Sequence, residues 1–117
     1  MKHSLMAAAA LATMIAAPAA AEQFAVRIDE AYQDANPRLM QTLHVTLLER
    51  FTENGAHYVV IDAPGVAYVE AFILAINRDA VALSVLAADW TNPTMQHLSP
   101  AQRLGFLQAI ECEFCVS

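Results

Sequence analysis

The chain has 117 residues, 57% of them hydrophobic, and a formal net charge of −6 at pH 7. This apolar content excludes a disordered chain, and the length allows one small domain with a single core. The acidic balance repels phosphate backbones and anionic lipid headgroups, so it disfavours nucleic-acid partners and electrostatic membrane binding.

Residues 1–21 have the pattern of a secretory signal peptide. Lys2 provides a basic start, and an apolar run follows over residues 5–17. This run is too short to span a bilayer comfortably, and Ala19 and Ala21 fit a cleavage site that requires small residues. We therefore expect cleavage after Ala21 and a protein that works in the periplasm or outside the cell.

Cleavage at this point leaves residues 22–117 as one domain. Because Lys2 leaves with the signal peptide, the net charge changes from −6 to −7. No integral membrane segment is expected after cleavage. The most apolar stretch, residues 66–88, is cut by the polar residues 77–79 into pieces that are too short to span a bilayer.

Two helices are expected at the start of this domain. Over residues 24–35, apolar side chains recur at spacings of three and four. Asn36 can cap a second helix with its side-chain oxygen, and Pro37 fits the first helical turn. An apolar row with residues four apart then covers residues 39–51, and Gly55 would end the helix.

The second of these segments also fits a strand. Residues 42–47 alternate between apolar side chains and Thr or His, and Asn54-Gly55 is the strongest short signal for a β-hairpin. On this alternative, the fold is β-rich and residues 41–51 pair with residues 57–62. We favour the helix, because the row of apolar residues is longer and has a proper start.

A short antiparallel β-meander is expected in the middle of the chain. Residues 57–62 are rich in β-branched and aromatic side chains, and residues 63–65 supply a turn. Residues 66–76 and 80–87 would form a hairpin around residues 77–79, although residues 66–76 also fit a helical period. Both hairpin segments are apolar on both faces, which implies a sheet face that a protein partner or a second copy covers.

A C-terminal helix is expected after a loop over residues 89–98. Ser99 and Gln102 form a capping box, and Pro100 suits the first helical position. The helix would continue to residue 113 and bury four apolar side chains: Phe106, Leu107, Ile110 and Phe114. The predicted fold is therefore an α+β domain with two N-terminal helices, a β-meander and a C-terminal helix.

Cys112 and Cys115 are the two cysteines of the chain and form a C-x-x-C motif. In an oxidising compartment they are expected to pair, and residues three apart on a helix lie near disulfide distance. A local structural disulfide is the favoured interpretation, and a redox-active dithiol or an intermolecular disulfide is the alternative. The negative end of the predicted helix, with Glu111 and Glu113 beside the motif, raises the thiol pKa and so disfavours redox activity.

No other motif points to chemistry. A structural zinc site needs four ligands, and the spacing of His44, His57 and His97 does not bring them to the cysteine pair. Ser84 and Ser99 lack the flanking glycines of a nucleophile elbow. We predict no catalytic residues, metal ligands or cofactor.

The sequence therefore predicts a small exported, non-catalytic protein that binds another protein or itself. Two alternatives remain open: a thiol–disulfide protein that uses Cys112 and Cys115, and a metal-binding periplasmic protein.

Overall fold

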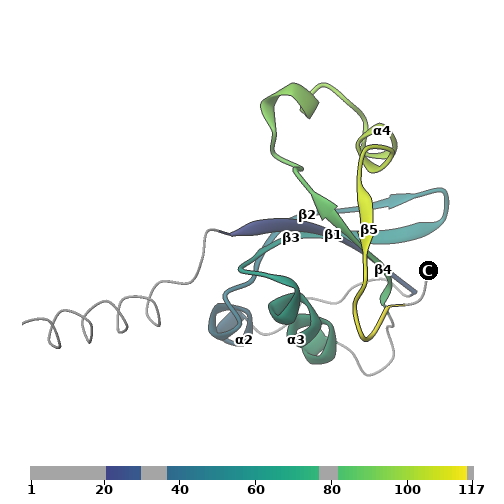
Figure 1. The fold of residues 1–117 in the computed structure, drawn as a ribbon. Coiled ribbons are helices and arrows are strands. Elements are labelled where there is room, and N and C mark those ends of the chain that lie inside the picture. Colours follow the sequence, from purple (N-terminus) through teal and green to yellow (C-terminus); the bar gives the residue numbers. More distant parts are fainter. Residues whose placement is uncertain (1–20, 30–36, 77–81, 116–117) are drawn as a thin grey trace, which may run out of the picture.

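The structure, a computed structural model, describes residues 21–29, 37–76 and 82–115, so the predicted signal peptide lies outside the described residues except for Ala21. The described residues form a five-stranded antiparallel sheet with three short α-helices and one 3-10 turn (Figure 1). In chain order, the elements are β1 (Glu22–Ile28), α2 (Pro37–Thr42), β2 (Thr46–Glu53), β3 (Ala56–Ala63), α3 (Val66–Ile76), β4 (Ala82–Ala88), η1 (Pro93–Met95), α4 (Pro100–Leu104) and β5 (Gln108–Ile110).

The strands lie in the order β2-β3-β1-β4-β5, and every neighbouring pair is antiparallel. β1, α2 and β2 form one β-α-β unit, and β3, α3 and β4 form a second. β3 lies between the strands of the first unit and β1 lies between the strands of the second, which is the connectivity of ferredoxin-like folds. Both of these helices lie on one side of the sheet, and α4 lies on the other side (Figure 1). The predicted arrangement of helix, helix, meander and helix is therefore wrong.

The first predicted helix is a strand in its described part. β1 is a central strand: Phe24, Val26 and Ile28 belong to the core on the α2/α3 side, and Ala25 belongs to the core on the opposite side. Phe24 and Ile28 are four residues apart, which fits both a helical row and one face of a strand. Pairing with β3 and β4 on its two sides decides for the strand. The rest of this prediction, residues 30–35, lies outside the described residues.

The second predicted helix begins at Pro37, as expected, but ends at Thr42. His44 then adopts a left-handed conformation, with φ of 58°. The amide of His44 donates to the carbonyl of Gln41 at 3.1 Å, and the amide of Val45 donates to the carbonyl of Met40 at 2.9 Å. These two bonds form a Schellman motif, and Met40 and the buried Val45, the two ends of its longer bond, both belong to the first core.

After this stop, the strand alternative is correct in outline. β2 pairs with β3 through a two-residue turn in which Asn54 and Gly55 both have positive φ, 53° and 81°, as a type I′ hairpin requires. The register shifts between Leu47 and Glu49. Leu47 therefore joins the core under the helices while Phe51 joins the core on the opposite face, although both lie in one apolar row of the sequence.

Residues 66–76, predicted as a strand with a helical alternative, form helix α3. β3 and β4 run parallel to each other, with β1 between them in the sheet. Parallel strands need a crossover connection, and α3 forms this connection between β3 and β4. The amides of Tyr68 and Val69 donate to the carbonyl of Gly65, which begins the helix. The predicted strand over residues 80–87 is confirmed from residue 82 onward, and the predicted turn over residues 77–79 lies outside the described residues.

The face of the sheet that we expected to need a partner is covered by the chain itself. The segment from Asp89 to Leu107 folds across it, and Trp90, 2% exposed, lies at the centre of a second core with Ala25 and Val60. The Trp90 ring stacks on Phe51 with ring centroids 5.3 Å apart. A sheet face left uncovered is therefore not a reason for association.

The C-terminal helix is much shorter than predicted. The capping box is confirmed, since the Ser99 amide donates to Gln102 Oε1 at 3.0 Å and Ser99 Oγ accepts from the Gln102 amide. The helix ends at Leu104, and β5 then pairs with β4. Gly105 weakens the helix, and strand pairing at the open edge of β4 replaces it. As a result, Phe106 is 71% exposed rather than buried.

Within the ranges that the structure describes, no helix is both long and apolar enough to cross a membrane.

Candidate protein-binding surfaces

The outer face of α3 is apolar. Its inner side chains, among them Val69 and Phe72, are buried in the first core. The outward positions are occupied by Leu74, which is 57% exposed, and by three alanines, which follow at intervals of four residues: Ala67, Ala71 and Ala75. A helix that is apolar on all sides is normally buried on all sides, so this face is unusual for an exposed surface.

The flanks of this face add further apolar surface. Tyr68 lies at one side, in an edge-to-face contact with His44 across 5.8 Å. Leu39 of α2, the neighbouring helix in Figure 1, is also exposed. Glu70 is the one charged residue of α3, and its Oε2 accepts a hydrogen bond of 2.7 Å from the amide of Glu113.

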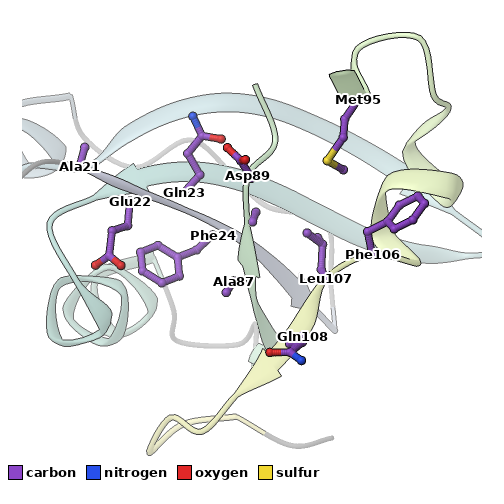
Figure 2. A pocket seen from close by; sticks show the side chains of 11 residues that line it. Ala21, Glu22, Gln23, Phe24, Ala87, Asp89, Met95, Phe106, Leu107 and Gln108 are labelled. Carbon is purple, nitrogen blue, oxygen red and sulfur yellow. The ribbon is translucent and has the colours of Figure 1, made fainter. Parts of the chain in front are cut away.

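A groove lies at the end of the sheet where β5 begins. Residues 106–108 lie along one side of it and residues 22–24 along the other, with the end of β4 between them (Figure 2). Met95 stands above Phe106 at one end of the groove (Figure 2). The groove is open to solvent and has a volume of about 570 Å³.

Two hydrogen bonds hold one wall of this groove in place. Gln23 Nε2 donates to Thr91 Oγ1 at 2.6 Å, and the Thr91 amide donates to Gln23 Oε1 at 3.0 Å. Next to them, Asp89 Oδ2 accepts a hydrogen bond of 2.7 Å from the side chain of Asn92. The segment that covers the second face of the sheet is thereby tied to β1 at its first residues.

The predicted pairing of Cys112 and Cys115 is present as a disulfide, with Cα atoms 5.4 Å apart. The pair lies in a turn after β5, where the Cys115 amide donates to the Cys112 carbonyl at 3.3 Å, and not on a helix. The argument from a negative helix end therefore does not apply. Both half-cystines pack against the first core, beside Phe114. Whether the pair is purely structural stays a prediction.

The other residues that the sequence suggested for chemistry lie apart. His44 follows α2, His57 lies on β3 with Thr52 Oγ1 at 3.3 Å from its Nδ1, and His97 lies in the loop before α4. Among the described residues, no group of three or more histidine, cysteine or acidic side chains could hold a metal ion. Ser84 lies within β4, and Ser99 caps α4.

Sequence reasoning missed both surfaces. It treated α3 as a strand, and it placed Phe106 in the buried row of a long helix. A signal for the exposed Phe106 was present: Gly105, two residues after Arg103, is a typical end of a helix. The expected helix would have ended there, and Phe106 would have been free to face solvent.

Comparisons with known proteins do not identify a relative. The ferredoxin-like connectivity occurs with many unrelated functions, so the function has to be argued from the surfaces. No protein-family model matches this chain, and neither a curated protein nor a solved structure matches it.

Proposed function

We propose that this protein is a small exported module that acts by association rather than catalysis, and that it pairs with a second copy through the outer face of α3. The observation that carries the proposal is the exposure of Leu74 within a helix face that it shares with three alanines. Contiguous exposed apolar surface of this kind marks interaction sites in soluble proteins.

A second copy is the partner that fits this face best. A two-fold axis would bring the same apolar face of each copy together, and the three alanines would allow the two α3 helices to approach closely. An acidic chain can self-associate in this way, because α3 carries a single charged residue, Glu70. Full burial of a Leu side chain contributes about 1.5–3 kcal/mol. Burying the exposed part of Leu74 in both copies would therefore contribute on the order of 2 kcal/mol.

The compartment is part of the proposal. Residues 1–21 would be removed during export, and residues 22–117 would work in the periplasm or outside the cell. The disulfide between Cys112 and Cys115 agrees with an oxidising compartment.

Sedimentation equilibrium of the purified protein tests the association. The expected result is a dimer at micromolar concentration for the wild type and a monomer for Leu74→Glu, which would place two like charges at the two-fold axis. His97→Glu is the matched control, since His97 is exposed and lies in the loop before α4. It should remain a dimer. A wild-type monomer at about 100 µM, a concentration at which weak dimers form, would refute the proposal.

A further inference from the structure

We propose that the disulfide between Cys112 and Cys115 controls the dimer contact on α3, a regulation that rests on the dimer proposed above. Two copies would pair strongly once the cysteines are oxidised and weakly while they are free thiols. The link is a hydrogen bond. The cysteine turn, residues 112–115, holds Glu70, the one charged residue of α3, at the flank of the apolar face.

Glu70 is the residue through which this control acts, because it lies next to Leu74 on the helix surface. Residues four apart on an α-helix are neighbours, and Leu74 follows Glu70 by four positions. A Glu70 carboxylate that is not held can turn over Leu74 and then lies at the contact between the two copies. There it meets the same charge of the second copy, and like charges at an interface oppose association.

The cysteine turn keeps this carboxylate in place at the flank. The Glu113 amide, which lies inside the turn, donates to Glu70 Oε2 at 2.7 Å. The disulfide and the bond of 3.3 Å from the Cys115 amide to the Cys112 carbonyl fix the backbone of the turn, and with it the direction of the Glu113 N–H. Both half-cystines also pack against the first core, together with buried side chains of α3.

The surroundings offer Glu70 no cation in place of the Glu113 amide. Glu70 lines a hollow of about 620 Å³, open to solvent, with Glu111, Glu113 and the two half-cystines. Among the described residues that line this hollow, none is Lys, Arg or His. When the thiols are separate, the turn loses its covalent closure and Glu70 becomes a free negative charge beside Leu74.

Thiol–disulfide exchange with an oxidising disulfide closes the turn. The Sγ atoms of Cys112 and Cys115 form a bond as their thiols give up two protons and two electrons, and the disulfide of the oxidant is reduced to two thiols. Such oxidants act in the compartments where disulfides persist. The exported chain would therefore pair where its reduced precursor does not.

Sedimentation equilibrium in both redox states tests the proposal. The oxidised wild type should dimerise at micromolar concentration, and after reduction with a trialkylphosphine its dimer dissociation constant should be about ten-fold higher or more. The double variant Cys112→Ser/Cys115→Ser should match the reduced protein without any reductant. Added salt should diminish the difference between the two states, because it screens the repulsion between the two Glu70 carboxylates.

Two glutamine variants separate the charge of Glu70 from a general loosening of the fold. Glu70→Gln removes this charge, so its dimer dissociation constants in the two redox states should agree within about two-fold. Glu111→Gln is the matched control, because Glu111 is exposed, precedes the same turn and lines the same hollow. It should keep the redox dependence of the wild type. The near-ultraviolet spectrum reports whether each protein stays folded.

Hydrogen exchange at the Glu113 amide tests the hydrogen bond without reference to the dimer. This amide should be protected in the oxidised protein and should exchange about ten-fold faster or more after reduction. Unchanged protection would overturn the proposal.

Three further results would do the same: equal dimer dissociation constants in the two redox states, a Glu70→Gln variant as sensitive to reduction as the wild type, or loss of the fold on reduction. Equal dimers in both states would refute the regulation alone. A monomeric oxidised wild type would instead refute the dimer itself, and its regulation with it.

Discussion

Replacement of Arg103 by alanine should destabilise the protein strongly, because this side chain joins the segment that covers the second face of the sheet. The Arg103 side chain is only 11% exposed. Its Nε donates to the Met95 carbonyl at 3.1 Å, and one of its terminal nitrogens donates to the Gln96 carbonyl at 3.2 Å. Its guanidinium carbon lies 4.9 Å from the centre of the Trp90 ring.

These contacts set the size of the effect. Hydrogen bonds from a charged donor contribute about 1.5–3 kcal/mol each, and a desolvated cation–π contact contributes about 1–2 kcal/mol. The two carbonyl acceptors lie near the surface and can be rehydrated, so the full sum will not be lost. The ion pair with Glu49, at 3.9 Å, adds little because the Glu49 side chain is 39% exposed. We expect Arg103→Ala to lower the free energy of unfolding by about 2–4 kcal/mol.

Urea unfolding measures this loss, and Trp90 gives the signal because it is the one tryptophan of the chain. Its indole nitrogen donates to Glu49 Oε1 at 2.6 Å across the same contact, so its emission reports the docking of the segment directly. The midpoint should fall in Arg103→Ala while the slope of the transition stays unchanged. Arg103→Lys, which keeps the charge but not the planar donor geometry, should lose about half as much.

Arg27→Ala is the matched control, since Arg27 is exposed on the same face of the sheet, and it should change the stability by only about 0.5 kcal/mol. A loss below about 1 kcal/mol for Arg103→Ala, or equal losses for the two arginine variants, would refute the reasoning. Either result would mean that the segment is held by Trp90 and its apolar neighbours alone.

Three further predictions concern the disulfide, the end of α2 and the start of the exported chain. Alkylation without reduction should label neither Cys112 nor Cys115, and rapid labelling of the native protein would contradict this. Changing both cysteines to Ser should lower the free energy of unfolding by only about 1–3 kcal/mol, because the loop that the disulfide closes is short. His44→Gly should raise the urea midpoint, with a gain of about 0.5–1 kcal/mol, since glycine adopts the φ of 58° without a Cβ penalty; a lower midpoint would show that the contact of His44 with Tyr68 matters more. Mass spectrometry of exported material should find Glu22 at the N-terminus, and recovery of the full chain would contradict export with cleavage.

Asn54-Gly55, which we favoured as the end of a helix, forms the hairpin turn of the strand alternative. The two signals for helix starts were interpreted correctly, since Pro37 starts a helix and Ser99 opens another with a capping box. Each depends on the backbone of a few neighbouring residues, so no tertiary contact is needed to recognise it. The pairing of the two cysteines was also predictable, since no other cysteine competes for either of them.

The helix and strand assignments around these signals failed where a segment fits two periods. A spacing of four, as between Phe24 and Ile28, places both residues on one side of a helix and also on one face of a strand. The apolar row from Leu39 to Phe51 gives no sign of the helix end at His44 or of the register shift after Leu47. The exposed surfaces depended on the same choices, because the face of Leu74 exists only when residues 66–76 are a helix.

What the sequence by itself determined is therefore where α2 and α4 start and that the two cysteines pair. Only the tertiary structure decided which segments became strands. β1 is a strand because it lies between β3 and β4, and residues 108–110 are a strand because β4 offers an open edge. The free energy of strand pairing comes from contacts between residues that are distant in sequence. It outweighs the intrinsic helix propensity of these residues, which differs by only a few tenths of a kcal/mol per residue. The same long-range pairing ends α4 early and leaves Phe106 in solvent beside the groove.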